Sequence, residues 1–161
     1  MKLKTVYMFV LAILTSALFA GGESAWMTDH PKAMEKAKSE KKWLLMDFEG
    51  SDWCPLCIEL RKKVFDMKEF KEYAEKNMVL LEVDFPGPMI RQPPELKKQN
   101  KELDAQYKVE GALPTVVVLS SDGKEVGRFG GEKGAEKLGQ IVESGPAAFI
   151  AELEKLKKLS K

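Results

Sequence analysis

The chain of 161 residues contains two cysteines, Cys54 and Cys57, separated only by Pro55 and Leu56. They lie where a short apolar run ends and a helical spacing of apolar residues begins. Cys54 is therefore predicted to lie at a helix N-terminus, where unpaired backbone N–H groups and the helix dipole favour a negative charge. Its pKa should fall below the roughly 8.5 of a free thiol, giving a thiolate that can attack a disulfide.

The residues after Cys54 suit the same chemistry. Pro55 would occupy the first helical position, where its missing N–H costs nothing. Cys57 lies three residues after Cys54, on the same helix face one turn further on, and is close enough to form a disulfide with it. The predicted cycle has two steps: Cys54 attacks a substrate disulfide, and Cys57 then displaces the substrate as the Cys54–Cys57 bond forms.

Three other roles for the cysteine pair compete with redox chemistry. The pair could be half of a zinc site, with carboxylates or His30, the single histidine, as the missing ligands. It could be a purely structural disulfide, although so short a loop restricts the unfolded chain little. The two thiols could also be inert and buried, although a strand-to-helix turn rarely lies in the apolar interior.

Composition argues against several other function classes. The 26 Lys and Arg residues are balanced by 25 Asp and Glu residues, so nothing indicates a nucleic-acid partner. Two cysteines and one histidine cannot complete a four-cysteine or Cys₂His₂ zinc site, and they allow at most one intrachain disulfide. The glycines between residues 127 and 134 match neither dinucleotide-binding nor phosphate-loop spacing. We therefore expect no nucleotide, no metal and no organic cofactor.

Residues 1–22 have the pattern of a signal peptide. Two lysines within residues 1–4 precede an uncharged, mostly apolar stretch, 5–20, which is shorter than the roughly 20 residues of a membrane-spanning helix. Small residues follow, and cleavage is expected near Ala20 to Gly22. The remaining domain, 23–161, is then predicted to be exported to the periplasm, where disulfides persist. An uncleaved inner-membrane anchor and a buried terminal helix are the alternatives.

The elements that must position the cysteines follow from the hydrophobic pattern. Helical spacing is found in residues 31–42, from Pro55, after a capping box of Asp66 and Glu69, in 96–107, and from Pro146. Strand-like runs are found in residues 43–48, 78–84, 115–119 and 124–129. Residues 86–94 form a proline-rich loop, and no element is predicted in the glycine-rich stretch before Pro146. This order predicts one α/β domain with a mixed sheet covered on both faces.

With its elements in this order, the sequence resembles the thioredoxin-like family, and specifically its exported bacterial members. The resemblance covers about residues 30–158. It rests on short segments along the chain: MDF at 46–48, WCPLC at 53–57, VD at 83–84, YKVEG at 107–111, LPT at 113–115 and DGK at 122–124. It implies the thioredoxin-like fold, with a central mixed four- to five-stranded sheet, helices on both faces, and a C-terminal β-hairpin and helix.

The resemblance also implies roles for residues around the cysteines. Pro114 would follow a cis peptide bond beside them, and Leu113 would offer backbone hydrogen bonds to the substrate chain. Asp47 would accept the proton of Cys57, and its pKa should be raised if it is buried. Trp53 would cover one side of the motif and contact partners. The residues alone also allow a strand-opening proline, a solvent-facing aspartate and a tryptophan that only packs.

Two differences from typical thioredoxins concern Asp47. The segment from Asp47 to Cys54 is one residue longer, which could displace Asp47 from beneath Cys57. Leu80 stands where thioredoxins place a lysine near the buried acid, so the strand 78–84 offers no charge partner for Asp47.

Together these observations predict an exported thiol–disulfide oxidoreductase that reduces or exchanges protein disulfides through Cys54 and Cys57. A reductase is favoured, with exported disulfide-containing proteins as substrates, a membrane dithiol as electron donor, and a monomeric state. The alternatives are a periplasmic disulfide oxidase or isomerase, and a non-catalytic thioredoxin-fold binding module.

Overall fold

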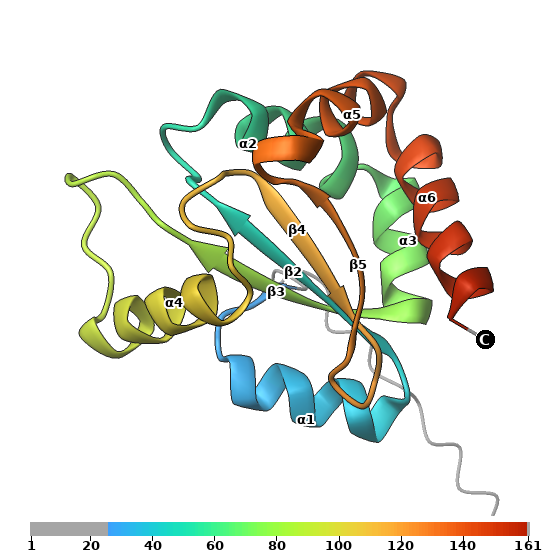
Figure 1. The fold of residues 1–161 in the computed structure, drawn as a ribbon, viewed down its shortest axis with the longest axis horizontal. Helices are drawn as coiled ribbons and strands as arrows, with labels where there is room; N and C mark the ends of the chain where they lie inside the picture. The colour runs from blue at the N-terminus through green and yellow to red at the C-terminus, as the bar shows by residue number, and fades with distance from the viewer. Residues whose placement is uncertain (1–25, 161) are drawn as a thin grey trace, which may run out of the picture.

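A mixed sheet with the strand order β1-β3-β2-β4-β5 forms the centre of the fold (Figure 1). The computed structural model describes residues 26–160, so the predicted signal peptide, 1–22, lies outside the described residues. The strands are β1 (Trp26–Met27), β2 (Trp43–Glu49), β3 (Met78–Asp84), β4 (Thr115–Leu119) and β5 (Glu125–Gly130). Strand β2 runs parallel to β3 and antiparallel to β4, which pairs with β5 as the predicted hairpin.

Helices cover both faces of this sheet, as predicted. They are α1 (His30–Glu40), α2 (Pro55–Leu60), α3 (Lys68–Asn77), α4 (Pro94–Gln106), α5 (Gly131–Ser144) and α6 (Pro146–Leu159). A π-helical segment, η1 (Arg61–Phe65), continues α2. Helices α1 and α4 lie on one face, and α2, α3, α5 and α6 lie on the other (Figure 1). No helix within residues 26–160 is long and apolar enough to cross a membrane.

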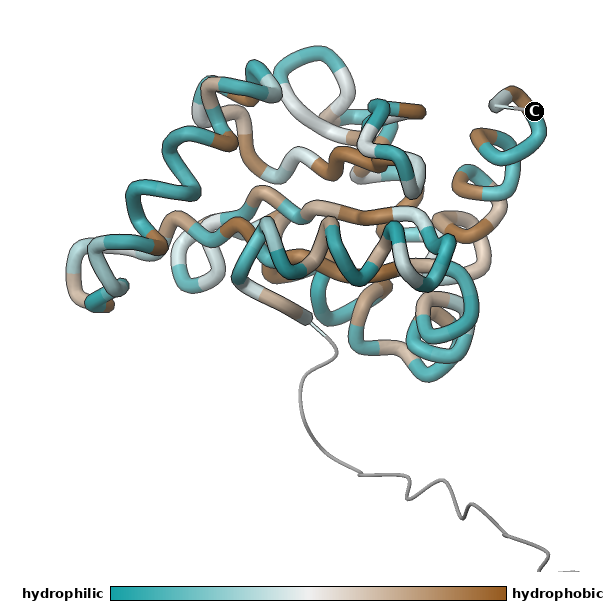
Figure 2. The backbone as a smooth tube through the Cα atoms, turned by 90° about the horizontal axis from the view of Figure 1, so that it is seen from below, coloured by the Kyte–Doolittle hydropathy of each residue, from teal (hydrophilic) through white to brown (hydrophobic). Residues whose placement is uncertain are grey.

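Strand β2 separates two apolar clusters. Leu44, Met46 and Phe48 pack with α1 and α4, whereas Leu45 packs with α2, η1 and the C-terminal helices. Because successive side chains of a strand point to opposite faces, the acidic residues of β2 face the same side as Leu45. The segments that run through the middle of the tube in Figure 2 are largely apolar, and β2 is buried from Leu44 to Glu49, as expected for a strand covered on both faces.

An aromatic cluster fills the face beneath α3, α5 and α6. Phe149 lies at its centre, with ring centroids 5.1 Å from Phe129, 5.4 Å from Phe65 and 5.9 Å from Phe70. Centroid separations of this size are those preferred by interacting aromatic rings. All four rings are buried, so this cluster anchors the C-terminal helices on the sheet.

Two elements were not predicted. Strand β1 has only two residues, too few for a pattern, and α5 occupies the stretch in which no element was predicted. Glycine lowers helix propensity by about 1 kcal/mol per residue, but α5 buries the apolar residues Leu138, Ile141 and Val142. Burial of an apolar side chain is worth about 1.5–3 kcal/mol, and it outweighs the glycines.

The capping box at Asp66 was also wrong. Helix α3 has Met67 as its N-cap, with no side-chain hydrogen bond there, because the chain reaches α3 through the π-helical segment. The predicted inward face of α3 is confirmed, since Phe70 and Ala74 are buried.

Candidate active site

The cysteine motif lies at one edge of the sheet, where three segments meet. Strands β2 and β3 are parallel and end together, with Glu49 paired to Asp84. Strand β4 is antiparallel to β2 and begins at the same edge, with Thr115 paired to Phe48. The sheet topology therefore places the motif, the proline-rich loop after β3 and Pro114 side by side.

Cys54 caps the N-terminus of α2, as predicted. Its backbone is extended (φ −90°, ψ 109°), and its Sγ accepts a hydrogen bond from the backbone N–H of Cys57 at 3.3 Å. Pro55 occupies the first turn. An N–H donor aimed at a sulfur at a helix start favours the thiolate when the pair is reduced.

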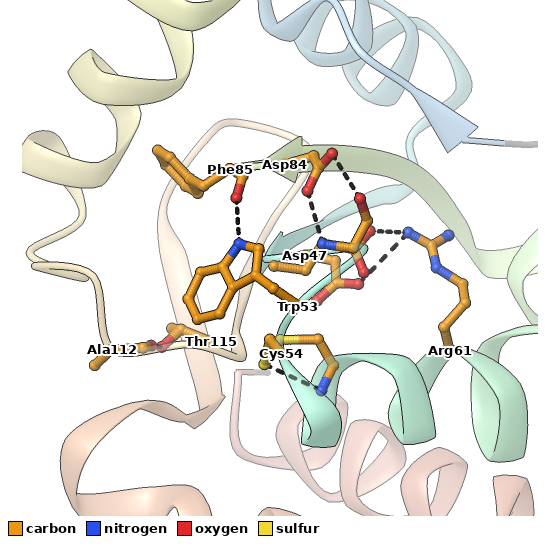
Figure 3. The surroundings of a disulfide bond; sticks show 11 residues. Asp47, Trp53, Cys54, Arg61, Asp84, Phe85, Ala112 and Thr115 are labelled. Carbon is orange, nitrogen blue, oxygen red and sulfur yellow. Dashed lines mark hydrogen bonds and ion pairs between the residues drawn. A yellow bond between two sulfur atoms is a disulfide. The ribbon is translucent and has the colours of Figure 1, made fainter. Parts of the chain in front are cut away.

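Cys54 and Cys57 form a disulfide, with their Cα atoms 5.2 Å apart (Figure 3). Cys54 is 5% exposed and Cys57 is 1% exposed. A disulfide leaves no thiolate to bind zinc, so the zinc and inert-thiol alternatives do not describe this form. Cys54, the predicted nucleophile, is therefore the less deeply buried residue of the pair.

The turn before Cys54 is tied to the end of β3. Ser51 donates hydrogen bonds from its backbone N–H and its hydroxyl to the Asp84 carboxylate, at 2.9 and 2.8 Å. The Asp52 carboxylate accepts the backbone N–H of Gly87 at 2.8 Å. The residue added to this turn is thus accommodated by bonds to the neighbouring loop.

Trp53 lies beside the disulfide with 53% of its surface exposed (Figure 3). Its indole Nε1–H donates to the Phe85 carbonyl at 2.8 Å, which fixes the ring against the proline-rich loop. A Cβ on Gly50 would lie only 2.4 Å from this ring, so the close approach requires glycine there. The ring is both anchored and accessible, which suits its predicted contact with partners.

The Leu113–Pro114 peptide bond is cis, as the resemblance implied. The Pro114 carbonyl accepts the backbone N–H of Gly131 at 3.0 Å, which links this loop to α5. Gly130 has φ 78°, and a Cβ there would lie 2.2 Å from the Pro114 oxygen. Gly130 is therefore a residue that supports the site and that sequence reasoning missed. The substrate-binding roles of Leu113 and Pro114 remain predictions.

Asp47 is buried beneath the motif, with 1% of its surface exposed, so it does not face solvent. In Figure 3 its carboxyl lies between the disulfide and the guanidinium of Arg61. Burial raises the pKa of Asp47 to about 7, with the positive charge of Arg61 acting in the opposite direction. Its Oδ1 is buried without a hydrogen-bond partner. Such a group can gain and lose a proton near neutral pH.

The charge partner of Asp47 comes from η1 rather than from β3. Arg61 Nη2 lies 3.8 Å from Asp47 Oδ2 and 3.3 Å from Glu82 Oε1, and it also donates to Glu49 Oε1. Sequence reasoning missed Arg61, Glu49 and Glu82. The available signal was the presence of these two glutamates, besides Asp47 and Asp84, in two mostly apolar strands, where an unpaired charge is costly.

Within the described residues, no group of histidine, cysteine and carboxylate side chains is arranged to hold a metal ion.

Comparisons with known proteins agree with this geometry. The family model of the thioredoxin-like domain matches residues 30–145. The disulfide bond reductase DsbH of Chlamydia pneumoniae is 35% identical over 130 residues, which are 81% of this chain and 71% of DsbH. The thioredoxin-related protein DsbJ of the same organism is 32% identical over 128 residues, covering 74% of this chain and 35% of DsbJ.

Comparisons with solved structures also find an oxidoreductase among the similar proteins. A DsbH oxidoreductase matches with a TM-score of 0.70 and 33% identity, over 91% of this chain and 93% of that structure. A disulphide isomerase from Xylella fastidiosa Temecula1 matches with a TM-score of 0.58 and 23% identity, over 87% of this chain and 98% of that structure, and shows the fold alone. The chain therefore belongs to the thioredoxin-like family and is a protein thiol–disulfide oxidoreductase related to DsbH, with Cys54 and Cys57 as its CxxC active site.

Proposed function

We propose that the protein is an exported reductase of protein disulfides in which Cys54 is the nucleophile and Cys57 the resolving thiol. The observation that carries this proposal is the position of Cys54, the less deeply buried residue of the pair, at a helix start where its Sγ accepts the N–H of Cys57. The reductase direction is supported by the similarity to DsbH, a disulfide bond reductase.

The reaction begins with the reduced pair. The Cys54 thiolate attacks one sulfur of a substrate disulfide, the substrate S–S bond breaks, and the other substrate sulfur leaves as a thiolate. Cys57 then loses its proton to Asp47 and attacks Cys54. The Cys54–Cys57 bond forms, the second substrate sulfur is released, and the substrate has gained the two electrons that the pair has lost.

Substrate binding is assigned to the surface around the disulfide. The exposed ring of Trp53 and the backbone of Leu113, beside the cis Pro114, flank the motif at the same sheet edge. An extended substrate segment can pair with the backbone of Leu113 while its cystine reaches Cys54. Disulfide-containing exported proteins fit this arrangement, and a membrane dithiol would return the electrons.

The direction of electron flow is tested by the midpoint potential of the Cys54–Cys57 pair in glutathione buffers. A reductase should lie near the roughly −270 mV of thioredoxin, whereas a value near about −120 mV is typical of a strong oxidant and would contradict the proposal. Trapping on a Cys57→Ala variant in cells identifies the substrates. Mixed disulfides to exported proteins through Cys54 are expected, and their absence would argue against such substrates.

Export is proposed from residues 1–22. The N-terminal sequence of protein recovered from the periplasmic fraction should begin between residues 21 and 23. A chain that retains Met1 and sediments with membranes would indicate the anchored alternative. The monomeric state is tested by light scattering of the mature protein.

A further inference from the structure

Three carboxyl groups face one guanidinium beneath the disulfide. Asp47 and Glu49 come from β2, Glu82 comes from β3, and Arg61 reaches all three from η1. We call these four residues the Arg61 cluster. Asp47 and Glu49 are both 1% exposed. The Arg61 guanidinium also lies over the Trp26 ring, at 4.3 Å from its centroid.

Ionisation of all three acids of the Arg61 cluster at once is energetically unfavourable. Three negative charges would surround one positive charge, and Asp84, at the end of β3, adds a further negative charge nearby. Burial and the repulsion from Asp47 raise the pKa of Glu49 to about 9. The pair of Asp47 and Glu49 therefore retains a proton near neutral pH, as like charges sharing a buried site do.

Arg61 and Glu82 act on Asp47 in opposite directions. The positive charge of Arg61 stabilises the ionised carboxylate of Asp47, which is the form that can accept a proton from Cys57. Glu82 lies 3.3 Å from the same guanidinium, and its negative charge raises the pKa of Asp47. Glu82 is also the partner of Asp47 in the register of β2 and β3, so the two acids lie side by side on neighbouring strands.

We propose that Arg61 and Glu82 are opposed positioning residues for the resolving step: Arg61 favours the ionised Asp47 that takes the proton from Cys57, and Glu82 limits this effect through its negative charge beside the same guanidinium. This inference rests on the proposed role of Asp47 as the proton acceptor. The proton moves from Cys57 Sγ to Asp47, the Cys54–Cys57 bond forms, and the bond between Cys54 and the substrate breaks.

The test is the pH dependence of the resolving step. Reduced protein is mixed with excess glutathione disulfide and quenched with acid, and the conversion of the Cys54–glutathione mixed disulfide to the closed pair is followed. Arg61→Gln should shift the rise of this rate to higher pH by about one unit, since it removes an opposite charge near Asp47. Glu82→Gln should shift it to lower pH, by roughly half a unit, because it removes a negative charge that raises the pKa of Asp47. Arg61→Lys should restore most of the wild-type profile.

Matched controls remove exposed charges from the same helical segment. Lys62→Gln takes a positive charge from the residue next to Arg61, and Glu59→Gln takes a negative charge that is paired with Lys63. Neither should move the profile. Carbon-13 NMR titration of the Asp47 carboxyl in the oxidised protein gives a second readout that does not depend on turnover. If Arg61→Gln does not fold, the Glu82→Gln and Arg61→Lys variants still test the proposal.

Asp47→Asn separates failure of this inference from failure of the proposed function. If Asp47→Asn slows resolution and abolishes the shifts caused by Arg61→Gln and Glu82→Gln, both proposals are supported. If Asp47→Asn slows resolution but the other two variants shift the profile in the same direction or not at all, the opposed roles are overturned and Asp47 keeps its role. If Asp47→Asn changes neither rate nor profile, the role of Asp47 is overturned, and the inference with it.

Discussion

Two buried clusters lie on the same face of the sheet and are stabilised in different ways. The aromatic cluster consists of Phe65, Phe70, Phe129 and Phe149, and apolar burial and ring packing hold it together. The Arg61 cluster buries charges, and burial of charge opposes folding unless the partners compensate. Trp26 joins the two, because its ring lies 5.1 Å from that of Phe65 and beneath Arg61.

Residues that stabilise the fold and residues that serve the reaction follow one another along one face of β2. Leu45 belongs to the apolar cluster on this face, while Asp47 and Glu49, further along β2, approach the motif. A carboxyl buried beside a disulfide costs stability and gains a pKa suited to proton transfer. Variants in the two clusters should therefore separate activity from stability.

The largest effect is expected at the motif itself. Cys54→Ser should reduce the rate of insulin-disulfide reduction to the uncatalysed background, because the nucleophile is lost. The free energy of unfolding should fall by no more than about 2 kcal/mol, since a disulfide that closes so short a loop restricts the unfolded chain little. Equal reduction rates for wild type and Cys54→Ser would favour the non-catalytic binding module.

The next largest effect is expected in the aromatic cluster. Phe149→Ala should lower the free energy of unfolding by about 3–5 kcal/mol, because it leaves a cavity between three other rings. The Cys54–Cys57 midpoint potential, measured under conditions where the variant is folded, should stay at the wild-type value. A changed potential would show that the two clusters are coupled rather than separate.

Asp47→Asn should affect stability and activity in opposite directions. The folded pKa of Asp47, about 7, lies above its ordinary value of 3.8, so the folded state retains a proton that the unfolded state releases. Wild-type stability is then lost as pH rises from about 4 through about 7, and Asp47→Asn escapes this loss. Urea unfolding should show the variant more stable near pH 8, by up to about 4 kcal/mol, and equal near pH 4.

In the same variant, resolution of the mixed disulfide should slow by at least about tenfold near pH 7, since a positioned proton acceptor is removed. Glu59→Gln serves as the control, because it removes an exposed carboxylate from the neighbouring helix. A pH-independent difference in stability between Asp47→Asn and wild type would show that Asp47 does not titrate in the folded protein.

The two clusters also differ in how far the sequence predicts them. Strand β2 and the helix start at Cys54 follow from local patterns, and Phe149 follows from the apolar spacing after Pro146. Arg61 does not, because its partners Glu49 and Glu82 lie on two strands that only the folded sheet brings together. A spacing rule within one helix cannot reveal such a long-range set.

Helix α5 escaped prediction for a different reason. Its buried residues have helical spacing, but glycines at 131, 134 and 139 weaken the local signal. Contacts with β5 and α6 provide stabilisation that compensates for the low helix propensity of the glycines. The helix is therefore determined by tertiary packing. The glycines at its N-terminal end have a local reason, since Gly130 and Gly131 both have positive φ beside Pro114.

The smallest effect is expected within α5, where it tests whether tertiary packing rather than helix propensity determines the helix. A Cβ on Gly139 would meet no other atom within 4 Å, so Gly139→Ala should raise the free energy of unfolding by about 0.5–1 kcal/mol and leave the reduction rate unchanged. Gly130→Ala is the contrasting variant. Its Cβ would lie 2.2 Å from the Pro114 oxygen, so it should lower both stability and the rate of substrate attack. Urea unfolding measures the stability of the two variants, and insulin reduction measures their rates. Destabilisation by Gly139→Ala would show that α5 needs that glycine for packing.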